Sequence, residues 1–300
     1  MLFYPKDKRE ILAWLVTRLK ELPIGSATTT FRLLADVFSL KQHEHGTPFA
    51  FEDLEIDDKG LFDVDFALTK AAEKAGLYLD SSKHWMLVEG LPFNLDFVVS
   101  PLKSKVPFTA IQYDEHACPS LPMTLSLNLE TRVIRLTDLE KGISGKRHTC
   151  NKREWARLTE LIDACRFDQW DEKYYEPVLD GTSWSMRLKA GRKVLKESHG
   201  DNGFPAAWRI FMALKRECRQ ILTREMLIPA KPAKCPFCGS TKVKPYLFGM
   251  PTAEASASGK YILGGCCITG NEPKWGCEKC QAKFYKGDPC DEDCCPPFGF

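Results

Sequence analysis

The chain has 300 residues, of which 44% are hydrophobic and 27% charged, and its formal net charge is +2. Such a composition is typical of an ordinary folded protein, and the length predicts two or three compact units. No stretch approaches the roughly 18 to 20 consecutive apolar residues that cross a bilayer, and the start MLFYPKDKRE becomes charged too soon for a signal peptide. These features argue against membrane helices and predict a cytoplasmic protein.

Charge is distributed unevenly along the chain. Residues 1–100 hold 11 Lys and Arg against 16 Asp and Glu, whereas residues 141–230 hold 18 against 12. An anionic partner would therefore favour the middle of the chain. The alternative, that both segments are ordinary solvated surfaces, stays open because net charge informs partners only weakly.

The first unit, residues 1–104, is predicted to hold three helices followed by three short strands. Apolar residues recur with helical spacing at 6–23, which Pro23 ends, then at 28–38, where the Thr residues are available as an N-cap, and at 64–76, which Gly76 closes. LYLDSS, WMLVEG and NLDFVVS at 77–100 have the composition of strands. This order of elements resembles that of a winged helix.

The comparison with a winged helix has one defect. A helix-turn-helix joins its helices by three or four residues, whereas the strongly acidic residues 39–63 intervene here. Negative charge opposes phosphate contact, and the third helix offers only Lys70 and Lys74. DNA recognition, a protein contact and a plain scaffold therefore all remain open for this unit.

The second unit, residues 105–230, is predicted to be an α+β domain in which a ββα pattern occurs twice. MTLSLNLETRVIRLTD alternates as two strands turned near Glu130, and NKREWARLTELIDAC is an amphipathic helix. SWSMRLKA and KVLKES form a hairpin turned at Gly191, and a helix begins at Pro205. TREMLIPAKPAK, at 223–234, is predicted to be the linker into the third unit.

Two patterns in this unit, DGTSW at 180–184 and GDNGFP at 200–205, resemble sequences of uncharacterised bacterial proteins. The resemblance implies no activity. Both stretches also have a structural explanation, because Asp-Gly and Asn-Gly supply turns and a Pro starts a helix.

The third unit, residues 231–300, contains nine of the thirteen cysteines. In a reducing cytosol these are thiols and metal ligands rather than disulfides. Two Cys-x-x-Cys pairs form a four-thiolate set, because two ligands separated by two residues reach one metal from a tight turn, and Gly239 suits such a turn. The predicted ligands are Cys235, Cys238, Cys277 and Cys280. Zinc is the expected metal, and an iron–sulfur cluster is the alternative.

The segment CPFCGS closely resembles the opening knuckle of zinc ribbons. KVKPYLFG, KYILGG and AKFYKG are predicted strands, and TAEASASG is a loop or short helix. The whole stretch, with its YLFGMP and GGCC signatures, resembles a four-cysteine ribbon found at the ends of uncharacterised bacterial proteins. The resemblance implies a ribbon fold and a bound zinc ion but no function.

Five cysteines remain outside the predicted site. Adjacent residues on a strand point to opposite faces, so at most one of Cys266 and Cys267 reaches the same metal, and a buried apolar role is favoured for either. The tail offers a second soft-metal site with one of these two, or a redox-sensitive end, through Cys290, Cys294 and Cys295.

No convincing catalytic constellation is found in the sequence, and no catalytic residue is assigned. The HEH of residues 43–45 lacks the spacing of a metalloprotease, and GKR at 145–147 lacks the upstream glycine of a P-loop. Asp114, His116 and Cys118 are the only candidates worth substituting, although such local adjacency is weak support.

These observations favour an α+β multidomain chain with a winged-helix-like unit, a ββα-type unit and a small β zinc ribbon. Four thiolates leave no open coordination position, which predicts a non-enzymatic protein. Nucleic acid is the favoured partner because basic residues surround the ribbon, namely Lys242, Lys244, Lys274, Lys283 and Lys286. Trp184 and Trp208 are candidate surface aromatics, joined by Trp275. The alternatives are an assembly subunit that docks a partner chain through the ribbon and the acidic loop, and an enzyme whose site is not visible in sequence.

Overall fold

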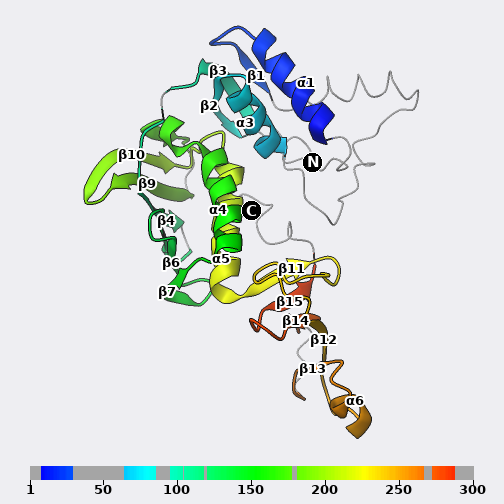
Figure 1. Cartoon of the computed structure of the whole chain (residues 1–300). Coiled ribbons are helices and arrows are strands. Elements are labelled where there is room, and N and C mark those ends of the chain that lie inside the picture. The colour runs from blue at the N-terminus through cyan, green and yellow to red at the C-terminus, as the bar shows by residue number, and fades with distance from the viewer. Residues whose placement is uncertain are drawn as a thin grey trace.

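The structure, a computed structural model, describes residues 8–29, 64–85, 95–103, 105–117, 120–177, 181–266 and 272–287. Within these ranges the protein is mixed α/β, with three β-sheets and few helices (Figure 1). The sheets follow one another along the chain, and helices cover one face of the largest. The predicted unit boundaries at 104 and 230 stay predictions.

The N-terminal part is a small antiparallel sheet with two described helices. It comprises α1 (Lys8–Glu21), β1 (Ala27–Thr29), α3 (Val64–Lys74), β2 (Leu77–Trp85) and β3 (Leu95–Pro101), with strand order β1-β3-β2. The apolar spacing that predicts α1 and α3 is confirmed, because Leu15, Leu19 and Leu68 are buried. Gly76, at a φ of +75°, follows the end of α3 as expected.

One prediction for this part is narrowed and one is wrong. Thr28 and Thr29 lie in β1, paired with β3, and not at a helix N-cap, whereas Thr30 lies outside the described residues. Trp85 ends β2 and does not open a new strand. Strand β2 continues through the polar residues before Trp85, and its pairing with β3 shifts register between Ser81 and Trp85. The rest of the predicted second helix, the acidic loop and residues 86–94 lie outside the described residues.

The central sheet has seven strands in the order β7-β6-β5-β4-β9-β10-β8, and only the β10–β8 pair is parallel. Its strands are β4 (Ala110–Ala117), β5 (Met123–Asn128), β6 (Val133–Asp138), β7 (Ile143–Thr149), β8 (Lys173–Tyr175), β9 (Thr182–Ala190) and β10 (Lys193–Asp201). Helices α4 (Lys152–Cys165) and α5 (Trp208–Thr223) lie side by side over one face, and a short 3-10 turn spans Phe167–Gln169 (Figure 1).

The doubled ββα pattern recovers both hairpins and both helices but misses β4, β7 and β8, which extend them into one sheet. These strands escape prediction because they are short or carry mostly polar side chains, as in the ISGKRHT of β7. Helix α5 also begins at Trp208 and not at Pro205, whose carbonyl instead accepts a turn hydrogen bond from the Trp208 N–H at 2.9 Å.

An aromatic cluster fills the space between the sheet and the helices. Trp170 lies at its centre, with ring centroids 5.6 Å from Trp184 and 5.7 Å from Phe211. Trp184 and Trp208 are only 3% and 6% exposed. The prediction that they are surface aromatics is therefore wrong, because strand alternation and the first turn of α5 point both indoles into the core.

The DGTSW and GDNGFP patterns interlock around Trp184. Its indole N–H donates to the Gly203 carbonyl at 2.9 Å, and the Asn202 side chain accepts from the Thr182 N–H at 2.7 Å while its own backbone has a φ of +57°. A Cβ on Gly200 would overlap the Trp184 indole, and one on Gly203 would lie 2.5 Å from the Tyr175 N. The glycines are thus needed for close packing as well as for turns.

We expect Gly200→Ala to destabilise the protein by about 1–3 kcal/mol or more, because the added methyl group overlaps a buried indole ring. Thermal or urea unfolding measures the change. His199→Ala, at the exposed neighbouring position, is the control and should stay within about 0.5 kcal/mol of the parent. Equal stability of the two variants would contradict this account of the glycine.

Candidate metal centre

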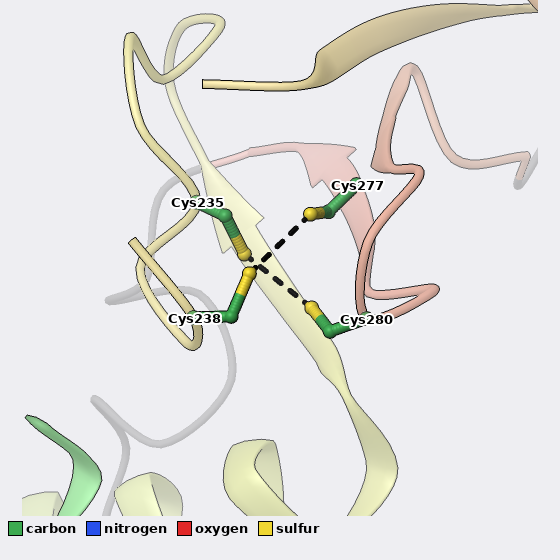
Figure 2. A group of neighbouring side chains, drawn as sticks. All are labelled: Cys235, Cys238, Cys277 and Cys280. Carbon is green, nitrogen blue, oxygen red and sulfur yellow. Dashed lines mark hydrogen bonds between the residues drawn. The ribbon is translucent and has the colours of Figure 1, made fainter. Parts of the chain in front are cut away.

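Two loops bring four cysteines together in the C-terminal part. The ligand atoms of Cys235, Cys238, Cys277 and Cys280 all lie within 4.8 Å of one another. Figure 2 shows the side chains converging in pairs from the two loops, with sulfur separations of 3.6 Å for Cys235–Cys280 and Cys238–Cys277. Four convergent thiols at these separations are compatible with one tetrahedral metal ion.

The two loops share one hydrogen-bonding pattern. In the first, the Cys235 N–H donates to Ser240 O and the Gly239 N–H donates to Cys235 O, both at 2.8 Å. In the second, the Cys277 N–H donates to Ala282 O at 2.9 Å and the Gln281 N–H to Cys277 O at 2.8 Å. Gly239 and Gln281 both have left-handed backbone, at φ of +73° and +58°. The turn expected from Gly239 therefore occurs twice, the second time without a glycine.

The thiols differ in how readily they deprotonate. Burial disfavours the Cys238 thiolate, but hydrogen bonds from the Ser240 backbone and the neighbouring thiols outweigh it, so the pKa of Cys238 lies below its usual value. Burial raises the pKa of Cys235 and of Cys280. Cys238 is therefore better prepared than Cys235 and Cys280 to meet an incoming cation, and the bound cation would favour the thiolates of those two cysteines.

The first loop packs tightly on the central helices. Phe237, between the first two cysteines, is fully buried, and the Asn151 side chain donates to its carbonyl at 3.3 Å. Arg157 donates to Pro236 O at 2.6 Å and to the Glu217 carboxylate at 2.7 Å. Pro236 and Phe237, which separate the first two cysteines, are thereby held by α4 and α5.

A five-stranded sheet carries the second loop. Its order is β11-β15-β14-β12-β13, formed by β11 (Glu225–Ile228), β12 (Val243–Leu247), β13 (Ile262–Leu263), β14 (Trp275–Cys277) and β15 (Lys283–Lys286). The short helix α6 (Ala253–Ala257) confirms the second reading of TAEASASG. Strand β11 pairs in parallel with β15, so the linker predicted at 223–234 is wrong over these residues. Their MLI core matches a strand as well as a linker, and only the long-range pairing decides.

The remaining cysteine predictions have mixed outcomes. Cys266 is exposed and stands after the end of β13, so it is neither on a strand nor buried. It is not part of the four-cysteine group. The other cysteines of the possible second site lie outside the described residues: Cys267, Cys290, Cys294 and Cys295.

The predicted lysines divide into two groups. Lys244 pairs with Glu278 at 2.6 Å and Lys283 with Glu225 at 3.5 Å, so carboxylates already offset their charges. Lys242, Lys274 and Lys286 are exposed, and none forms an ion pair within the described ranges. Trp275 is half-buried against the core.

The catalytic candidates are not assembled into a site. Asp114 on β4 pairs with Arg187 at 2.6 Å. His116 is exposed near the end of the same strand, and Cys118 lies outside the described residues. Alternation along β4 places Asp114 and His116 on the sheet face opposite the helices.

A second group of potential ligands was not anticipated from the sequence. His148, Cys150 and Glu154 bring their ligand atoms within 4.8 Å of one another. The buried Glu154 carboxylate already receives His148 Nε2 and the Asn151 N–H at 2.8 and 3.0 Å, and its other oxygen pairs with Arg224.

This arrangement favours a structural role over metal binding. Burial and the nearby Glu154 raise the pKa of Cys150 to about 12, which keeps the thiol neutral. The Arg224 guanidinium provides the positive charge that a cation would bring. Asn151 and Glu154 form a capping box at the start of α4, and the Asn-x-x-Glu spacing in NKRE is the signal that predicts it.

No protein-family model matches the sequence, and a search of curated proteins gives no match. Among the described helices, none combines the length and apolar character needed to span a membrane. The cytoplasmic location stays a prediction.

We expect Cys277→Ser to lose bound metal and to unfold more easily, by more than about 3 kcal/mol, because one of four ligands is removed from a buried site. Metal content of the purified protein and thermal melting test this. Cys266→Ser is the matched control, since Cys266 is exposed and outside the group, and it should leave both unchanged. Unchanged metal content and melting in Cys277→Ser would rule out the site.

Proposed function

We propose that this chain is a non-enzymatic zinc protein that binds nucleic acid, in a regulatory or accessory role. Zinc is the metal that best fits four thiolates supplied by two short turns. A tetrahedral ion held by four thiolates has no position left for water, so its role would be structural. Elemental analysis should find zinc, whereas the visible absorption of an iron–sulfur cluster would overturn this assignment.

Two further assignments belong to the same proposal. The strand after α1, the order β1-β3-β2 and the position of α3 before the hairpin support a winged-helix-like N-terminal unit. The paired turns and the strands between them support a zinc ribbon at the C-terminus. Both kinds of module bind nucleic acid in many proteins.

One observation carries the choice of nucleic acid. Around the closed four-thiolate site, Lys242, Lys274 and Lys286 are exposed and have no ion pair among the described residues. Uncompensated cations on or next to the strands of this sheet favour a polyanion, because each phosphate contact releases counterions.

We expect the full chain to bind short DNA or RNA with an affinity that falls steeply as salt rises. Fluorescence anisotropy across a salt series measures this. The triple variant Lys242→Ser, Lys274→Ser and Lys286→Ser should show a smaller salt slope, by up to about 3. Lys244→Ser with Lys283→Ser is the control, because those two lysines are already paired, and it should change the slope less. Flat binding curves at low salt would overturn the proposal.

Point variants are preferable to truncation at residue 230. Strand β11 pairs with β15, and Phe237 fills a site on the central helices, so a chain that ends at 230 would lose both contacts. Loss of binding after such a truncation would not separate a missing surface from a damaged fold.

A second candidate function is docking of a protein partner, favoured by one specific observation. The far end of the ribbon exposes Met250, Tyr261 and Leu263, at 96%, 39% and 55%. Figure 1 shows β13 and α6 projecting away from the central sheet. Exposed apolar side chains gathered in one place commonly mark a contact with another protein.

This second candidate predicts stable association with a protein partner that survives high salt. Met250→Ser with Leu263→Ser should weaken that association while leaving nucleic-acid binding and melting unchanged, because both side chains are largely in solvent. Co-purification of tagged parent and variant chains measures the difference. An identical set of partners for both chains would contradict it.

A further inference from the structure

Five exposed basic residues gather where the β6–β7 hairpin meets the start of α4. We call this surface the basic corner; it consists of Arg132, Arg135, Arg147, Lys152 and Arg153. None of the five has an ion-pair partner within the described parts of the chain. The one exposed acid in the adjoining β5–β6 turn is Glu130.

Backbone geometry places these residues around the β7 edge of the central sheet, with Arg135 and Arg147 on the face opposite the helices and Lys152 and Arg153 in the helix that covers the other face. Arg135 and Arg147 are direct partners in the pairing of β6 with β7. The Arg132 carbonyl accepts from the Cys150 N–H at 2.9 Å, which sets Arg132 beside the last residues before α4. Lys152 and Arg153 are the first two residues of that helix.

The basic corner also reaches the metal-site loop. A Cβ on Gly239 would lie 2.8 Å from Arg153 Nη1, so this guanidinium rests against the first turn. Lys242, exposed and unpaired among the described residues, follows three residues later. The basic surface therefore continues from the central sheet onto the ribbon.

Two arginines directly opposite each other need an explanation, because like charges at paired positions destabilise a sheet. The next residue across the same row, on β5, is Ser126, which brings no negative charge. Further along this row Arg187 has the ordinary arrangement, with Asp114 at 2.6 Å and Glu197 at 3.5 Å. The contrast indicates that Arg135 and Arg147 are left for an anion from outside.

The surroundings favour phosphate on a duplex over stacked single-stranded bases. Guanidinium groups match phosphate oxygens with two parallel hydrogen bonds. Single strands bind mainly by stacking bases on aromatic rings, and across β4 to β7 the one Phe, Tyr or Trp is Tyr113, which is buried. Small polar residues of β5, Thr124, Ser126 and Asn128, occupy the open face instead.

We propose that the basic corner, together with Lys242, binds the phosphate backbone of double-stranded nucleic acid. This inference rests on the proposed function and locates its principal surface on the central sheet, beside the ribbon. Because the contacts are to phosphate, the surface would bind duplexes without regard to sequence.

The test compares the parent chain with a full-length double variant that carries both Arg135→Ser and Arg147→Ser. The control is Arg192→Ser with Lys193→Ser, which removes two exposed charges from the end of the distant β9–β10 hairpin. Binding of short duplex DNA, duplex RNA and single-stranded DNA is measured across a salt series. Melting confirms the fold, and the double variant should melt no lower than the parent because a like-charge pair is removed.

We expect the parent to bind a duplex more tightly than the single strand, and the double variant to reduce the duplex salt slope by about 2, since two phosphate contacts are lost at about 0.9 each. The control should leave the slope unchanged. The two duplexes distinguish DNA from RNA as the preferred source of phosphate.

The experiment distinguishes failure of the basic corner from failure of the proposed function. If the parent binds with a steep salt slope and the double variant retains it, the basic corner is refuted while the proposed function stands. Tighter binding to the single strand would likewise refute the duplex assignment. If the parent shows no salt-dependent binding, the proposed function and this inference both fail.

Discussion

The position of the metal-site loop depends on the packing of the buried Phe237 ring. Its ring lies 6.3 Å from that of Phe284 with the planes at 8°, and the guanidinium carbons of Arg157 and Arg224 lie 5.7 and 5.4 Å from its centre. Burial of one such ring stabilises the fold by about 1.5–3 kcal/mol, and cation–π contacts add to it. Because Phe237 stands between two of the four cysteines, the packing that stabilises the fold also fixes the loop that presents them. The first loop of the metal site is thus packed against the helices of the central sheet.

Helix α4 connects the three parts of the protein. Near its first turns Asn151 and Arg157 hold the metal-site loop. After its last turn, Arg166, buried and in left-handed backbone, pairs with Glu73 of α3 at 2.9 Å. A helix of 14 residues spans about 21 Å, so one rigid element positions the N-terminal sheet and the ribbon on opposite ends of the central layer. A ligand bound at the start of α4 would therefore rest against a framework that the metal site helps to hold.

Most of the helices and hairpins that depend on short-range sequence patterns could be predicted from the sequence. Both Cys-x-x-Cys pairs, the amphipathic helices α1, α3 and α4, and the hairpins β5–β6 and β9–β10 follow from spacing within a few residues. The failures are long-range. The sequence of β11 predicts a linker, whereas in the structure it pairs with β15. Trp184 and Trp208 are predicted to be exposed, but packing between the sheet and α5 buries both. Gln281 adopts the same left-handed backbone conformation as Gly239 because the second loop closes around the site. A glutamine at this position does not predict that conformation from sequence.

Charge shows the same limit of local inference. The excess of basic residues at 141–230 suggests a generally cationic middle segment, but part of this charge is paired within the fold. Six of these side chains pair with carboxylates of the described elements: Arg157, Arg166, Arg187, Lys215, Arg219 and Arg224. Their positive charge is compensated, and two of them, Arg166 and Lys215, are buried. Among the remaining basic residues of this segment, Arg147, Lys152 and Arg153 lie at the β7 edge and the first turn of α4, while Arg192 and Lys193 lie at the far end of the β9–β10 hairpin. No carboxylate of the described chain forms an ion pair with Arg147 or with its strand partner Arg135. A count along the sequence cannot make that distinction, because the compensating acids come from strands and helices up to 100 residues away.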